Sequence, residues 1–215
     1  MSFRLHLVRH AEGTHNPEHD TTILDPELTE RGVKQSEELS RNFPFSESVG
    51  LVITSPLTRT IRTALVGFQK TLDEKYYANK CGIPNGATFL VEPDIQAHSA
   101  RPCDTGSEWP VVRSRFPDLP WDLVNQDPAF PAKTGPYEPE QEKLERRGRA
   151  VQERLRTQFK ELEDTDRPDI AVVTHGGFMW FVSNNKGVPD MAHYRTVLVS
   201  FDEESKLIIE DEITQ

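Results

Sequence analysis

The chain has 215 residues, of which 35% are hydrophobic and 28% are charged, and this length favours one domain or one domain with a large insertion. Its formal net charge of −10 at pH 7 argues against nucleic acid and anionic membrane surfaces as partners. A small anionic substrate is not excluded, because a local group of Arg and His side chains can hold an anion inside a negative protein.

The N-terminus and the cysteines indicate an intracellular protein. Residues 1–6 lack the apolar stretch of a secretory signal, and no apolar run approaches the length needed to span a membrane. Cys81 and Cys103 do not make a disulfide framework. We therefore expect a cytoplasmic protein without a membrane partner.

The first quarter of the chain predicts two strand–helix units. Apolar residues alternate over 3–8, which predicts a strand that ends at Arg9-His10, and residues 11–27 read as a loop. Thr29 is the expected N-cap of the first helix. After an apolar strand at 51–54, the Ser55-Pro56 pair predicts an N-cap followed by proline at the first helical position.

The rest of the chain contains an irregular segment and then a return to regular elements. Residues 98–139 hold many prolines and few periodic apolar positions, so we expect an irregular insertion with one short helix near 109–116. The other predicted elements are a strand at 88–91, a long helix at 139–164, a buried strand at 170–174, a helix at 178–182 and edge strands at 196–201 and 207–209.

This alternation predicts an α/β fold, with three α/β/α layers, a mostly parallel central sheet and an irregular cap. We expect a single domain over 1–215, with the cap at about 67–140. Ligands of such sheets bind beyond the carboxyl ends of the strands. Three apolar strands end in polar residues, at Arg9-His10, Ser55 and His175, so we expect the site at that edge.

The residues at this edge suit a phosphate-like dianion. Arg9, His10 and His175 lie at predicted strand ends, and Arg59 lies one turn into the helix after Ser55. The planar guanidinium of arginine bonds two phosphate oxygens at once, and glycines after His175 let backbone N–H groups approach an anion. A single histidine at a strand end is more often structural, but the four residues together favour a function.

Other signals favour no metal and no cysteine chemistry. His15 and His19 fit solvated loop histidines better than metal ligands, since no trusted zinc spacing is present. A cysteine phosphatase needs an arginine six residues after its thiol, and Trp109 stands there after Cys103. We expect neither a metal nor a cofactor.

Four segments resemble, in order, those of the histidine phosphatase (phosphoglycerate-mutase-like) superfamily. Each alone is a weak signal, whereas four in order, each at the expected element, are highly specific. Alanine stands at position 11, where the family more often has glycine. The segments are LVRHAEGTHN at 7–16, LTERGVKQ at 28–35, SPLTRTIRTA at 55–64 and VVTHGG at 172–177.

The resemblance implies a role for each matching residue. His10 would be the nucleophile that becomes phosphohistidine, while Arg9, Arg59 and His175 would bind the phosphoryl group and stabilise its transition state. Asn16 would contact phosphate, and Gly176 would take part in substrate binding. The implied activity is hydrolysis of a small phosphomonoester or activated phosphate, with specificity set by residues 67–140.

The sequence departs from the family pattern at the general acid. The resemblance places a glutamate where this chain has Ala97. Asp104 and His98 rank first as replacements because they are near in sequence. Two alternatives stay open: a phosphoglycerate-type mutase, which fits the altered acid segment poorly, and a repurposed non-hydrolytic enzyme or phosphate-binding relative.

Overall fold

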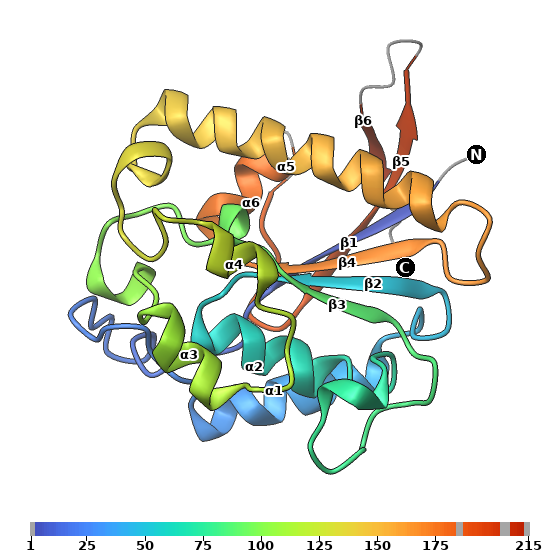
Figure 1. The fold of residues 1–215 in the computed structure, drawn as a ribbon, viewed down its shortest axis with the longest axis horizontal. Coiled ribbons are helices and arrows are strands. Elements are labelled where there is room, and N and C mark those ends of the chain that lie inside the picture. The colour runs from blue at the N-terminus through green and yellow to red at the C-terminus, as the bar shows by residue number, and fades with distance from the viewer. Residues whose placement is uncertain (1–2, 184–186, 203–206, 213–215) are drawn as a thin grey trace.

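The computed structural model describes residues 3–183, 187–202 and 207–212, and a six-stranded sheet lies at its centre (Figure 1). The strand order is β3-β2-β4-β1-β5-β6, and the four strands from β3 to β1 are parallel to one another. Strand β5 pairs antiparallel with β1, and β6 pairs antiparallel with β5. The prediction of a mostly parallel sheet is confirmed. The strands are β1 Phe3–Arg9, β2 Val49–Thr54, β3 Thr88–Val91, β4 Asp169–Thr174, β5 Tyr194–Phe201 and β6 Leu207–Glu212.

Helices cover both faces of the sheet, as the predicted three layers require (Figure 1). Helices α1 and α2 lie on one face, and the long α5 lies with α6 on the other. The short α3 and α4 lie near the end of the sheet toward which the parallel strands run. The helices are α1 Glu30–Asn42, α2 Thr58–Gly67, α3 Trp109–Arg115, α4 Asp122–Gln126, α5 Gln141–Leu162 and α6 Gly176–Val182.

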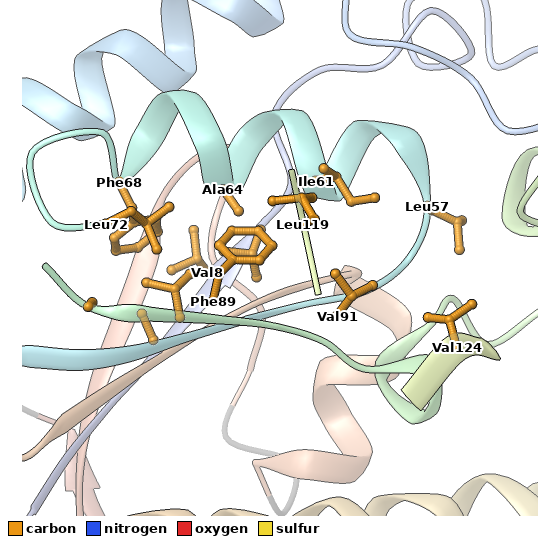
Figure 2. Close-up of a cluster of buried hydrophobic side chains, with 14 of the residues drawn as sticks. Val8, Leu57, Ile61, Ala64, Phe68, Leu72, Phe89, Val91, Leu119 and Val124 are labelled. Atoms are coloured by element: carbon orange, nitrogen blue, oxygen red, sulfur yellow. The ribbon is translucent and has the colours of Figure 1, made fainter. Parts of the chain in front are cut away.

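The two faces of the sheet contribute to two apolar clusters. Strands β2 and β4 are buried along their whole length, because helices cover both of their faces. Val52 and Val173 join the cluster beneath α2, where Phe68 and Phe89 also pack (Figure 2). Side chains alternate between faces along a strand, so the neighbouring residue Val172 joins the cluster beneath α5.

Strand register brings the predicted polar strand ends to one edge. Arg9 pairs with Thr174, and the backbone N–H of His10 donates to the Thr174 carbonyl at 3.0 Å. The backbone N–H of Ser55 donates to the Val173 carbonyl at 3.2 Å. Residues directly after β1, β2 and β4 therefore lie side by side.

Two helix starts test the capping predictions. Thr29 caps α1 as predicted, since its Oγ1 accepts from the Gly32 N–H at 2.9 Å. The prediction for α2 is wrong: the helix begins at Thr58 and its N-cap position is Leu57, which supplies no side-chain acceptor. Among the described residues, no helix is long and apolar enough to cross a membrane.

Candidate active site

A pocket of about 420 Å³ opens beyond the carboxyl ends of β1 and β4. A larger hollow of about 650 Å³ lies beside α1 and α2 and contains none of the predicted site residues. All of the residues predicted to bind substrate or take part in catalysis line the first pocket: Arg9, His10, Asn16, Arg59, His98, Asp104, His175 and Gly176.

His10 is held in the tautomer that leaves its Nε2 unprotonated. Its Nδ1 lies 2.8 Å from the Ala11 carbonyl oxygen, which only accepts, so Nδ1 holds the proton and Nε2 keeps its lone pair. The Ala11 N–H in turn donates to Thr63 Oγ1 on α2 at 3.0 Å. His10 is only 5% exposed, because Arg59 and His175 pack against it.

His175 is held in the other tautomer, with its proton on Nε2. Its Nδ1 accepts from Arg59 Nη2 at 3.0 Å, so the proton of the neutral ring is on Nε2, which donates to Ser55 Oγ at 3.0 Å. Burial, followed by the charge of Arg59, holds the pKa of both His175 and His10 well below the ordinary value of 6.5. The pocket therefore contains two uncharged imidazoles, with ring centroids 5.2 Å apart.

Arg59 is the central cation of the pocket, and only 1% of it is exposed. Its Nε donates to His10 Nε2 at 3.3 Å, and its Nη1 donates to the Cys103 carbonyl at 2.7 Å. Nη2 contacts Asp104 Oδ1 at 3.1 Å in addition to His175. One guanidinium thus donates hydrogen bonds to both histidines and to the segment that follows β3.

Asp25, in the loop predicted over 11–27, sets the start of the helix that holds Arg59. Its Oδ1 accepts from the Thr58 N–H at 2.9 Å, while Oδ2 accepts from Thr58 Oγ1 at 2.7 Å and from the Ser107 N–H at 3.1 Å. A carboxylate at a helix N-terminus satisfies free N–H groups. Thr58 is distant in sequence, so local capping rules could not identify this contact, and Ser55 serves His175 instead.

Helix α1 holds the loop that follows His10. Glu12 accepts from Thr29 Oγ1 at 2.8 Å and from Arg31 Nη1 at 3.2 Å, while its N–H donates to Gln35 Oε1 at 2.9 Å. A Cβ on Gly32 would overlap the Glu12 carbonyl oxygen, so only glycine allows this approach. The segment 28–35 therefore acts as a cradle for the loop.

Asn16 and His15 lie together at the wall of the pocket. Asn16 Nδ2 donates to His15 Nε2 at 3.1 Å, and its Oδ1 accepts from the Gly13 N–H at 2.9 Å. The interpretation of His15 as a solvated loop histidine is wrong, because its side chain is buried. Burial and the Arg59 charge lower the pKa of His15 to about 4. His19 is exposed, as expected, at the mouth of the pocket.

The two candidate acids differ in their contacts. Both carboxylate oxygens of Asp104 accept hydrogen bonds, from Arg59 and from Ser99 Oγ at 2.7 Å. The His98 ring has no hydrogen-bond partner in the described part of the chain, and it lies against Gly177, where any Cβ would overlap it. Ala97 is buried in the apolar cluster beneath α2 and adds no polar group to the pocket.

Arg9 and Cys103 also line the pocket. Arg9 is half-buried, with Nη1 donating to the Pro189 carbonyl at 3.4 Å, and it lies beside Gly176. Burial raises the pKa of the Cys103 thiol, which does not favour a thiolate nucleophile. No cluster of three or more His, Cys, Asp or Glu side chains arranged to hold a metal ion occurs in the ranges that the structure describes.

Comparison with known proteins supports the predicted family. The sequence model of the histidine phosphatase superfamily (branch 1) matches residues 5–74, so the predicted resemblance to this superfamily is confirmed. A probable phosphatase of Schizosaccharomyces pombe is 25% identical over 175 residues, covering 80% of this chain and 73% of that one. Phosphoglycerate mutase-like protein 1 of Arabidopsis thaliana is 28% identical over 216 residues, covering 87% and 74%.

Solved structures of superfamily members share the fold. A mycobacterial glucosyl-3-phosphoglycerate phosphatase aligns with a TM-score of 0.57 at 18% identity, covering 97% of this chain and 98% of that one. A putative alpha-ribazole-5'-P phosphatase of Escherichia coli aligns with a TM-score of 0.54 at 16% identity, covering 99% and 96%. The prediction of a histidine-phosphatase-type enzyme on an α/β fold is confirmed.

Proposed function

We propose that this enzyme hydrolyses a small phosphomonoester through a phosphohistidine intermediate on His10. The observation that supports this most directly is the state of the His10 ring, whose Nδ1 proton is bound to the Ala11 carbonyl while Nε2 meets Arg59. An imidazole that is neutral and held in this tautomer is a competent nucleophile toward phosphorus.

In the first step, the Nε2 lone pair of His10 attacks phosphorus, the bond from phosphorus to the leaving oxygen breaks, and that oxygen takes a proton. In the second step, water attacks the phosphohistidine, the P–N bond breaks and inorganic phosphate leaves. Arg59 already contacts Nε2, so oxygens of a phosphoryl group on that nitrogen fall within its reach. Arg9 binds the other oxygens, His175 orients Arg59 through its Nδ1, and Asn16 and Gly176 line the substrate side.

Of the two candidate acids, we assign the proton to His98. Its ring lines the pocket and makes no hydrogen bond to the described residues, whereas both oxygens of Asp104 accept hydrogen bonds. Asp104 then serves to hold Arg59. Burial lowers the pKa of His98, so its protonated form is a stronger acid than an exposed histidine and gains population as the pH falls.

Trapping of the intermediate tests the proposal. Rapid acid-free denaturation during turnover of a ³²P-labelled ester should leave acid-labile, base-stable phosphate on the wild-type chain and none on His10→Ala. A wild-type enzyme that hydrolyses no phosphomonoester across a broad panel would contradict the proposal. Interconversion of phosphoglycerate isomers without net hydrolysis would favour a mutase instead.

A further inference from the structure

Three consecutive carbonyls just before His98 are each bound by a side chain from a different part of the fold. The carbonyls belong to residues 95–97. Thr174 Oγ1 on β4 donates to the first at 2.7 Å, Arg147 Nη2 on α5 donates to the second at 2.9 Å, and Lys133 Nζ from the cap donates to the third at 2.8 Å. This clamp fixes the backbone from which His98 projects.

Two of the three donors are cations, and neither forms an ion pair with a carboxylate in the described part of the chain. Lys133 Nζ also donates to Gln96 Oε1 at 2.7 Å, so both of its acceptors are neutral, and no described carboxylate lies within 4.0 Å of it. Arg147 is 4% exposed, its guanidinium lies over the Phe178 ring at 4.1 Å, and its Nε and Nη1 have no partner among the described residues. Neutral side chains could bind these carbonyls without burying charge, so the charges themselves need an explanation.

The two charges act on the catalytic pocket. Together with burial, which is the larger effect, Lys133 and Arg147 lower the pKa of His175 and of His98. Lys133 is itself affected by its surroundings: burial lowers its pKa to about 7, the charges of Arg147 on α5 and Arg59 on α2 add to this, and Asp104 opposes it. The positive potential of this cluster therefore extends to the place where the phosphoryl group binds.

We propose that Lys133 is a positioning residue of the active site, whose ammonium both holds the Ala97 carbonyl, and with it His98, and strengthens binding of the phosphoryl dianion without touching it. This inference rests on the proposed phosphatase pocket. Because an amine loses its charge as the pH rises through its pKa, dianion affinity should fall as the pH rises through about 7. A bound dianion should in turn favour the protonated amine.

Tungstate binding measured by calorimetry against pH tests the inference without relying on turnover. Tungstate stays a dianion where inorganic phosphate itself titrates. Between about pH 6.5 and 8.5 we expect wild-type affinity to fall, and Lys133→Met to bind about tenfold more weakly at the lower pH with little further change. Lys133→Arg should bind well throughout, because guanidinium keeps its charge. Lys143→Met is the matched control, since Lys143 pairs with Glu138 and Glu140, and it should behave as wild type.

Lys133→Gln separates the hydrogen bond from the charge, because its amide can still donate to the Ala97 carbonyl and it is the variant most expected to fold. Wild-type affinity and pH dependence in this variant would overturn the role of the charge. An identical pH dependence in wild type and Lys133→Arg would also overturn it. Tungstate binding that requires Arg59 but ignores Lys133 would remove this inference and leave the proposed function intact, whereas no tungstate binding by wild type would remove both.

Discussion

At the scale of single residues, the pocket combines uncharged imidazoles with closely packed guanidinium groups. His10 and His175 are neutral because burial and the Arg59 charge disfavour their protonated forms. In the proposed mechanism, the same Arg59 charge that keeps His10 neutral also attracts the anion that His10 attacks. One buried side chain thus serves two purposes, at the expense of holding a guanidinium out of water.

The neutral state of His10 has a testable pH dependence. A nucleophilic base works when deprotonated, and its pKa in the folded protein lies well below 6.5, so activity should persist as the pH falls through 6.5. The measurement is kcat/KM for nitrophenyl phosphate, because its pH dependence reports groups of the free enzyme and this ester needs little acid assistance. A loss of kcat/KM with an inflection at the ordinary histidine pKa would contradict the assigned environment.

Arg59 and Arg62 provide a matched pair on one helix. Arg59 contacts both pocket histidines, whereas Arg62 is about half exposed and pairs with Glu27 at 3.3 Å. Arg59→Ala should weaken vanadate binding by about 10- to 100-fold, the usual worth of hydrogen bonds to a charged group. Arg62→Ala should leave the vanadate inhibition constant unchanged, and a larger effect at Arg62 would show that the wrong arginine has been assigned.

Leaving-group dependence distinguishes His98 from Asp104. His98→Gln should lower kcat for an alkyl phosphate by about 10²- to 10⁴-fold and leave nitrophenyl phosphate nearly unaffected, because only the alkoxide needs a proton. Asp104→Asn should depress both esters alike, since Asp104 holds Arg59. The reverse pattern would transfer the acid role to Asp104.

At the scale of elements, two helices act as supports for loops rather than only as layers of the fold. Gly32→Ala places a methyl group on the Glu12 carbonyl, so α1 or the loop must shift. We expect a loss of about 1–3 kcal/mol in the free energy of unfolding together with a lower kcat. Gly67→Ala on α2 is the control, because its new methyl meets only the flexible end of Leu39. Equal effects of the two changes in urea unfolding would argue against the cradle.

Some features of the elements could be predicted from the sequence and others could not. The strand ends, the Thr29 cap and the grouping of His10 with His175 follow from local patterns, since parallel strands end at one edge. The Asp25 contact with Thr58 and the Lys133 clamp do not, because both join segments far apart in sequence through irregular chain. The burial of His15 could not be predicted, because the composition of a loop does not indicate what covers it.

Ala97 illustrates the same limit in another way. Sequence places it where the family has glutamate, and restoring that glutamate looks like a direct test of acid catalysis. Its side chain instead packs in the apolar cluster that includes Leu57 and Phe130. A carboxylate there would be buried among apolar side chains, so Ala97→Glu would report on folding as well as on proton transfer.

At the scale of the whole molecule, aromatic packing joins the segment predicted as a cap to the apolar cluster beneath α2. Phe130 contributes to the cluster beneath α2, and its ring is so close to Gly106 that a Cβ there would lie 2.7 Å from it. Phe130→Ala should lower the free energy of unfolding by about 3–5 kcal/mol and raise KM, because Gly106 follows the Arg59-binding segment. Val111→Ala, at an exposed site on α3, should change neither quantity. Unchanged KM in Phe130→Ala would show that the cap and the pocket are independent.

The pairing of β1 with β4 also matters while the chain is being made. Of the six described strands, β1 leaves the ribosome first, yet its parallel partner comes only with residues 169–174 and its antiparallel partner with β5 after that. Until residues 169–174 are made, a strand whose Leu5 and Leu7 are fully buried in the folded protein has no partner. The nascent chain therefore presents an apolar edge for a long interval, which is the kind of surface that chaperones bind and that aggregates recruit. Slow elongation late in the message would lengthen that exposure, and the yield of folded enzyme should fall accordingly.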